Sequence, residues 1–169
     1  VALGGKSPYQ LMSSSYGKGL VLVYRLSKSK YANQLSGVGA AQSNNRWNSK
    51  GTEIIYTAQS RALAMAEVLV HLDTYALEMS YVMLTISIPD HLATVFLEPT
   101  NEDWNLFPNL VSSQKIGDRF IQENTFAIAR VPSAVVKGDY NYLLNPHHTD
   151  FKNIKIEEVS DFLFDNRLF

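Results

Sequence analysis

The chain has 169 residues and a formal net charge of −1 at pH 7, with 46% hydrophobic and 18% charged residues. Such a length suits a single domain that buries about two thirds of its unfolded surface. The near-neutral charge gives no general attraction to nucleic acid or to an anionic membrane, so neither is expected as a direct partner. Because cysteine is absent, disulfides, thiolate catalysis and cysteine-bound zinc are excluded.

Two further absences favour a soluble cytoplasmic protein. No apolar run approaches the roughly 20 residues that a membrane-spanning helix needs. The first six residues, VALGGK, lack the basic and then apolar order of a signal peptide. Residues 1–18 are rich in serine, glycine and lysine without periodicity, which indicates a flexible N-terminal tail or a remnant of the expression vector. One domain is therefore expected over residues 19–169.

Short strands dominate the predicted elements. A dense β-type run predicts a strand over 20–24, which places Arg25 near its end, and the polar stretch 27–45 predicts a loop or short helix. In chain order there follow a strand over 53–56, a helix over 60–72, strands over 81–88 and 93–97, an irregular connection over 98–112, a helix over 113–123, and strands over 126–131, 141–144, 154–156 and 162–164. Because strands outnumber helices and do not alternate with them, the pattern favours an α+β domain with largely antiparallel sheets.

The helix predicted over 60–72 is apolar almost all the way round and carries one carboxylate, Glu67. Only Ser60, Ala64, Glu67 and His71 share the narrow remaining stripe, so the helix is expected to be mostly buried. Two interpretations stay open. Either this stripe is a strip of solvent in which Glu67 and His71 pair at i and i+4, or Glu67 faces a cleft.

A metal site is not expected. The four histidines, His71, His91, His147 and His148, form no pair at metal-ligand spacing. The sequence also lacks the G-x-S-x-G turn of serine hydrolases, and Ser133 has no obvious histidine base.

Five residues remain that together could bind and cleave a dinucleotide: Arg25, Arg46, Tyr56, Glu67 and Ser133. Each alone has an ordinary structural explanation, such as a salt bridge, an aromatic stack or a turn hydroxyl. Guanidinium groups match phosphate oxygens in bidentate geometry, and a tyrosine ring can stack on a heterocycle. A carboxylate on a rigid helix can accept a hydrogen bond from a ribose hydroxyl and face a developing oxocarbenium ion.

The order of short motifs along the chain resembles that of the RES-domain toxins of bacterial toxin–antitoxin pairs. The matching motifs are Tyr24-Arg25-Leu26, Arg46-Trp47-Asn48 with Gly51, Tyr56-Thr57-Ala58, Ala66-Glu67-Val68, Gln114 with Gly117-Asp118, Val131 to Val136, Leu144-Asn145-Pro146 with His148, and Phe164-Asp165 with Arg167-Leu168. The chain departs from the family at Asn44-Asn45, where glycines are usual, and at Thr149, where proline is common.

This resemblance implies a fold like that of the ADP-ribosyltransferase toxins, a split β-sandwich with flanking helices around a cleft for NAD. It implies a toxin that depletes NAD by hydrolysis or phosphorolysis of the nicotinamide–ribose bond, with NAD as substrate and no cofactor. The alternative is a mono-ADP-ribosyltransferase that modifies a host protein. A third possibility, from another class, is a module that binds a nucleotide without cleaving it. The implied partner is an antitoxin with an Xre-type helix-turn-helix domain, and a homo-oligomer is compatible with the sequence.

The resemblance also implies roles for individual residues. The family is named for an Arg, a Glu and a Ser, which correspond here to Arg25 or Arg46, Glu67 and Ser133. The expected catalytic residues are Glu67, Arg25 and Tyr56, and the expected NAD-binding residues are Arg46, Ser133, Tyr24 and Asn48.

Overall fold

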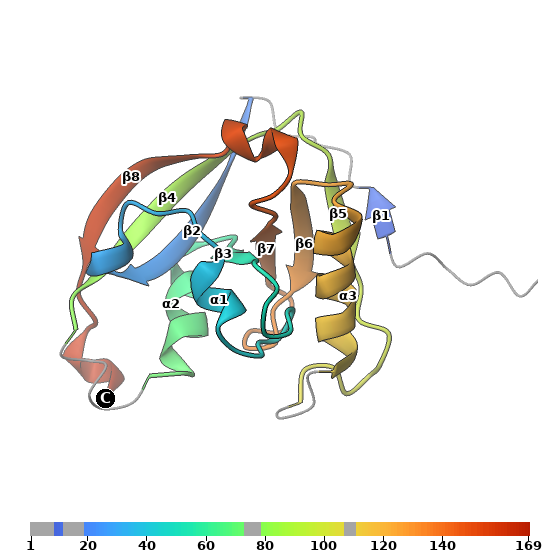
Figure 1. The fold of residues 1–169 in the computed structure, drawn as a ribbon. Helices are drawn as coiled ribbons and strands as arrows, with labels where there is room; N and C mark the ends of the chain where they lie inside the picture. The colour runs from blue at the N-terminus through green and yellow to red at the C-terminus, as the bar shows by residue number, and fades with distance from the viewer. Residues whose placement is uncertain (1–8, 12–18, 73–78, 107–110) are drawn as a thin grey trace, which may run out of the picture.

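The structure is a computed structural model that describes residues 9–11, 19–72, 79–106 and 111–169. In chain order its elements are β1 (Tyr9–Leu11), β2 (Leu20–Lys28), η1 (Ser29–Tyr31), α1 (Val38–Ala41), β3 (Ile55–Ala58), α2 (Arg61–Leu69), β4 (Tyr81–Pro89), β5 (Thr94–Leu97), α3 (Val111–Glu123), β6 (Ile128–Pro132), β7 (Tyr140–Leu144), η3 (Thr149–Asn153), β8 (Lys155–Phe162) and η4 (Asn166–Leu168). The strands form one sheet in the order β1-β5-β6-β7-β3-β2-β4-β8 (Figure 1).

The predicted α+β class with largely antiparallel strands is confirmed. The ladder between β5 and β6 is parallel, and the other ladders of the sheet are antiparallel. The expected split appears as a narrow junction between β2 and β3. These two strands share a single residue pair, Tyr24 with Ala58, whereas β2 pairs with β4 along its whole length, from Leu20 to Lys28.

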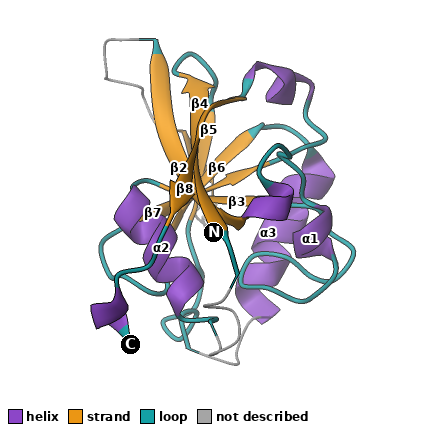
Figure 2. Ribbon diagram, turned by 90° about the vertical axis from the view of Figure 1, so that its left-hand side faces the viewer, coloured by secondary structure: helices purple, strands orange, loops and turns teal. Residues whose placement is uncertain are grey.

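Three hydrophobic clusters hold the helices and loops onto the sheet. α2 packs through Leu63 and Ala64 on Leu26, Ala58 and Met83. Phe120 of α3 belongs to a second cluster, together with Trp47 and buried residues of β5, β6 and β7. The third cluster gathers buried residues of β2, β3, β4, β6 and β7. Figure 2 shows α2 on one side of the strands and α1 and α3 on the other.

Several predicted boundaries differ from the observed ones because long-range pairing decides them. β2 continues past residue 24 to Lys28 opposite β4, so Arg25 lies within the strand and not near its end. The two strands predicted over 154–156 and 162–164 are one strand, β8, which pairs with β4 with a register shift between Thr85 and Ile86. β4, β5, β7 and α3 lie close to their predicted ranges.

The helix predicted over 60–72 is shorter and less buried than expected. α2 ends at Leu69, and of its side chains only Leu63 and Ala64 are fully buried. Val70, which follows the helix, is 58% exposed. The expectation of a mostly buried helix was therefore wrong, because the sheet covers only one side of α2.

Most of the tail predicted over 1–18 lies outside the described residues. The exception is β1, which that prediction did not foresee and which pairs antiparallel with β5. None of the helices in the described ranges has the length and apolar character needed to cross a membrane.

Candidate functional site

α2 carries the central carboxylate of the site. The Ser60 hydroxyl caps the helix by accepting a hydrogen bond from the Leu63 N–H at 3.1 Å, which fixes where the helix begins. Glu67 therefore lies in the last turn of α2, and the helix contacts both β2 and β3. The Glu67 side chain is partly buried rather than solvated on the outer surface.

Two hydrogen-bond donors, one directly after β6 and one in β7, fix one oxygen of this carboxylate. Oε1 of Glu67 accepts a hydrogen bond from Oγ of Ser133 at 2.7 Å and another from Nδ2 of Asn141 at 2.6 Å. Within the described part of the chain, Oε2 of Glu67 has no hydrogen-bond partner and His71 is not paired with it. The solvent-strip interpretation, with a Glu67–His71 pair, is therefore not what the structure shows.

Ser133 holds its position through the turn that follows β6. Its hydroxyl oxygen accepts hydrogen bonds from the backbone N–H groups of Val135 at 3.1 Å and Val136 at 2.9 Å. A serine hydroxyl has one hydrogen to donate and two lone pairs that accept. Since two N–H groups occupy the accepting side, the hydroxyl hydrogen is directed at Glu67.

Tyr56 joins the site to the loop that precedes β3. Its phenol donates a hydrogen bond to Oδ1 of Asn48 at 2.7 Å and accepts one from the Trp47 N–H at 3.0 Å. Burial raises the pKa of the Tyr56 phenol above its usual value, against the opposing effects of the Trp47 N–H and the Arg46 charge. The phenol is therefore a permanent donor at neutral pH.

Arg46 links this loop to the segment around Trp104. Its Nη1 donates to the carbonyl oxygens of Trp104 at 2.6 Å and Leu106 at 3.2 Å. Burial lowers the pKa of the Arg46 guanidinium, and attraction to the Glu67 and Tyr56 side chains opposes part of that shift. The cation of Arg46 thus lies within electrostatic range of the Glu67 carboxylate.

α3 supports the Arg46 loop through side-chain hydrogen bonds to its backbone. Nε2 of Gln114 donates to the Asn45 carbonyl at 2.9 Å, and a carboxylate oxygen of Asp118 accepts from the Ser49 N–H at 2.9 Å. Between them, Gly117 lies so close to the Trp47 backbone that a Cβ atom would overlap the carbonyl oxygen. The motif of Gln114 with Gly117 and Asp118 therefore has a structural explanation.

Arg25 and Tyr24 lie across the narrow junction, on β2. Successive side chains of a strand point to opposite sides, so only one of the two faces α2. Tyr24 does, because the guanidinium of Arg61 lies over its ring at 4.4 Å. Burial lowers the pKa of Arg25, and its Nη1 is buried with no hydrogen-bond partner among the described residues. No hydrogen bond or ion pair in the described ranges joins Arg25 to Glu67.

The structure thus brings together five of the seven predicted site residues and places the other two on the adjacent strand. The five are Arg46, Asn48, Tyr56, Glu67 and Ser133, and the two are Tyr24 and Arg25. Sequence reasoning missed Asn141, the second donor to Glu67. Its signal was a polar residue in a predicted strand, but only the pairing of Asn141 with Ala58 directs its amide toward α2.

Comparison with known proteins identifies a family and several relatives. The RES domain family matches residues 22–165. The chain is 36% identical over 141 residues to the Prs ADP-ribosylating toxin of Sphingobium sp. (strain YBL2), covering 81% of this chain and 88% of that protein. It is 35% identical over 151 residues to Toxin Res of Pseudomonas putida, covering 88% of this chain and 100% of that protein.

A solved structure shares the fold. A chain of the M. tuberculosis MbcT–MbcA toxin–antitoxin complex superimposes with a TM-score of 0.69 at 21% identity, with 85% of each chain covered. At this identity the likeness concerns the fold, whereas the family match spans most of the sequence. The chain therefore belongs to the RES domain family.

Proposed function

We propose that the protein is a toxin that cleaves the bond between the nicotinamide nitrogen and C1′ of ribose in NAD. The observation that carries this proposal is the state of Glu67: one carboxylate oxygen is fixed by Ser133 and Asn141, and the other is left without a partner among the described residues. A carboxylate held in this way can accept a hydrogen bond from a ribose hydroxyl and stabilise positive charge on C1′ and the ring oxygen.

The chemistry of the leaving group explains how one carboxylate suffices. The nicotinamide nitrogen is positively charged in NAD, so nicotinamide departs neutral when it takes the bonding electrons. An ordinary glycosidase needs a second carboxyl group to protonate its leaving group. With water as acceptor, NAD and water give nicotinamide, ADP-ribose and one proton; with inorganic phosphate the second product is ADP-ribose 1″-phosphate.

The cationic residues support binding of the pyrophosphate. Arg46 orders the segment from Trp104 to Leu106 and lies in electrostatic range of Glu67. Among the described residues, one buried guanidinium nitrogen of Arg25 has no hydrogen-bond partner, and such a group is costly unless an anion satisfies it. In this proposal both arginines bind the anionic part of NAD, and the Tyr56 ring packs on the nicotinamide side.

Incubation of the pure protein with NAD tests the proposal. Release of free nicotinamide is expected, measured by chromatography, and phosphorus NMR distinguishes ADP-ribose from ADP-ribose 1″-phosphate.

Glu67→Gln keeps the side-chain volume but removes the charge, so the rate of nicotinamide release should fall by at least about 100-fold with little change in melting temperature. Glu53→Gln, at a partly buried glutamate paired with His147, is the matched control and should keep full activity. Unchanged turnover by Glu67→Gln would refute the assignment, and saturable binding of intact NAD would favour a binding module.

ADP-ribosyl transfer to a protein is the second candidate. A relative with 36% identity is named an ADP-ribosylating toxin, and transfer uses the same cleaved bond with a side chain as acceptor. Labelled NAD would then leave its label on a protein of the host lysate, and Glu67→Gln would abolish that label.

An antitoxin is the proposed partner. The structural neighbour was solved as a toxin–antitoxin complex, and the family resemblance implies an Xre-type helix-turn-helix antitoxin. Co-expression with the product of an adjacent gene of that type should restore growth of cells that produce this protein and should yield a complex on size exclusion.

A further inference from the structure

The sheet consists of two groups of strands that meet at a weak junction, here called the seam. One group is β2, β4 and β8, and the other is β1, β5, β6, β7 and β3. At the seam only Tyr24 and Ala58 pair, whereas β3 and β7 pair over all four residues of β3. The sheet hydrogen bonds at the seam are therefore few, and the two groups of strands are joined there mainly by the hydrophobic cluster that they share.

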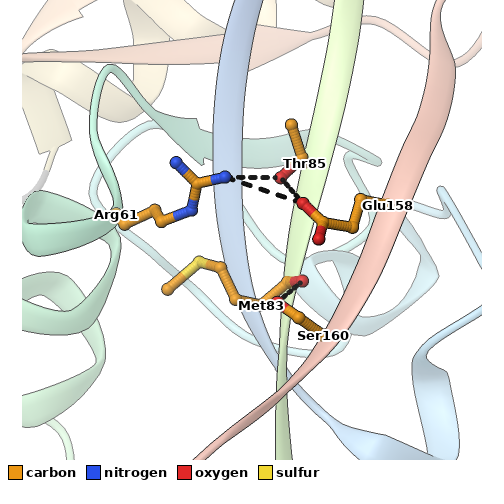
Figure 3. A network of polar contacts seen from close by, with 5 residues as sticks. All are labelled: Arg61, Met83, Thr85, Glu158 and Ser160. Carbon is orange, nitrogen blue, oxygen red and sulfur yellow. Dashed lines mark hydrogen bonds and ion pairs between the residues drawn. The ribbon is translucent and has the colours of Figure 1, made fainter.

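α2 crosses this seam and is bound at its two ends to different groups. Its first residue, Arg61, contacts β4 and β8 through Thr85 and Glu158 (Figure 3). Its seventh residue, Glu67, is bound to Asn141 in β7 and to Ser133 directly after β6. The helix therefore connects the two groups of strands independently of the sheet hydrogen bonds.

Among the described residues, Arg61 has three partners, all in one group of strands. Its Nη2 donates to Oγ1 of Thr85 at 3.2 Å and lies 3.7 Å from Oε2 of Glu158. Oγ1 of Thr85 in turn donates to Oε2 of Glu158 at 3.4 Å. The guanidinium also lies over the Tyr24 ring at 4.4 Å. Figure 3 shows Arg61 reaching from α2 toward β4 and β8.

This network adds little to stability but constrains geometry. The Arg61 and Glu158 side chains are 54% and 59% exposed, and exposed ion pairs contribute little to the free energy of unfolding. Glu67 follows Arg61 by six positions in the helix, a rise of about 9 Å along a rigid axis. A shift or tilt of the helix at Arg61 therefore moves Glu67 with it.

We propose that Arg61, held by Glu158 and Thr85, is a positioning residue that sets α2 across the seam and so fixes the Glu67 carboxylate relative to the substrate. This inference rests on the proposed role of Glu67 in NAD cleavage. Arg61 itself does not touch Glu67 or the reacting bond; it acts through the helix. A misplacement of a catalytic group by about 1 Å can slow a reaction about 100-fold, so a smaller shift of Glu67 should lower kcat more than it weakens NAD binding.

Steady-state kinetics of nicotinamide release provide the first test. Arg61→Gln and Glu158→Gln should each lower kcat about tenfold with KM for NAD little changed. The double variant should be no slower than the slower single variant, because both remove the same contact. Glu157→Gln is the matched control: this neighbouring glutamate accepts from Ser87 and is not bound to Arg61, so kcat should stay unchanged. A raised KM with unchanged kcat, unchanged kinetics or additive losses would each overturn the proposal.

Charge reversal and hydrogen exchange complete the test. Arg61→Glu combined with Glu158→Arg should recover part of the kcat that Arg61→Glu alone loses. Amide exchange in residues 61–69 and 131–141 should become faster in Arg61→Gln and stay as in the wild type in Glu157→Gln. If the wild type releases no nicotinamide, the proposed function fails, and the exchange data still decide whether Arg61 constrains α2. Unchanged exchange in Arg61→Gln would refute the coupling whatever the activity.

Discussion

Oγ of Ser133 donates a hydrogen bond of 2.7 Å to Oε1 of Glu67 across 66 residues of sequence. The Nδ2 of Asn141 donates to the same oxygen at 2.6 Å. Two donors on one carboxylate oxygen fix both the position and the rotamer of Glu67, which leaves the second oxygen with a defined direction.

Ser133→Ala should impair both stability and activity. The substitution removes one donor to Glu67 and leaves the N–H groups of Val135 and Val136 without their acceptor. The expected loss is about 1–3 kcal/mol in the free energy of unfolding, together with at least about tenfold slower NAD cleavage. Urea unfolding and nicotinamide release measure the two effects.

Ser87→Ala is the control for that variant. Ser87 is also buried, at 2% exposure, and its hydroxyl donates to Glu157 away from Glu67. It should lose stability but keep the wild-type rate. Equal losses of activity in the two variants would show that the Ser133 effect is one of folding alone.

Asn141→Asp should make activity depend on pH. The new carboxyl group would lie against Oε1 of Glu67, and repulsion between two carboxylates raises the pKa at which the pair loses its last proton. Below that pKa a protonated Asp can donate to Glu67 as the amide does, so activity is retained. As pH rises through it, the donor is lost and the rate falls. Rate profiles between about pH 5 and pH 8, where proteins tend to be most stable, test this.

Asn141→Ala distinguishes the effect of an added charge from the effect of a lost hydrogen-bond donor. This variant should cleave NAD slowly at every pH, because no group can replace Nδ2. If Asn141→Asp and Asn141→Ala have parallel pH profiles, the hydrogen bond from residue 141 does not orient Glu67.

Tyr56→Phe should destabilise the protein and make its melting temperature depend less on pH in alkaline solution. The phenol makes hydrogen bonds to Asn48 and Trp47, so its loss should cost about 1–3 kcal/mol. Because burial raises the folded-state pKa of Tyr56 above the usual tyrosine value of 10.0, the linked stabilisation is fully present below pH 10 and is lost as pH rises further. Melting temperatures between pH 8 and pH 11 (spanning the usual tyrosine pKa of about 10) should fall more steeply in the wild type. Tyr31→Phe, at a residue 48% exposed, should behave as the wild type; an equally steep fall in Tyr56→Phe would contradict the prediction.

Gly117→Ala should prevent α3 from packing on the Arg46 loop. The added Cβ would overlap the backbone carbonyl of Trp47, and backbone atoms yield less readily than a flexible side chain. A loss of about 3 kcal/mol in the free energy of unfolding is expected, seen as a lower melting temperature. Gly39→Ala is the control, since its Cβ would meet nothing within 4 Å and α1 would gain helix propensity. A melting temperature near that of the wild type in Gly117→Ala would refute the close packing.

Local patterns in the sequence predicted most of the elements, though not β1, and named the residues of the candidate site other than Asn141. β4 and α3 follow from an unbroken β-type run and a helical repeat, both of which depend on near neighbours in sequence. The motifs around Arg46, Tyr56, Glu67 and Ser133 also contained the residues that the fold brings together. Each of these signals is local, so it survives without knowledge of the remaining chain.

Only the tertiary structure decided the relations between elements. The extension of β2 to Lys28 and the fusion of two predicted strands into β8 both result from pairing with β4. The solvent-strip and cleft interpretations of Glu67 predict the same helical pattern, and the choice between them required the donors from Ser133 and Asn141. Residue type and period determine which groups are available and on which element, whereas strand register and helix docking depend on contacts far apart in sequence and determine which groups meet.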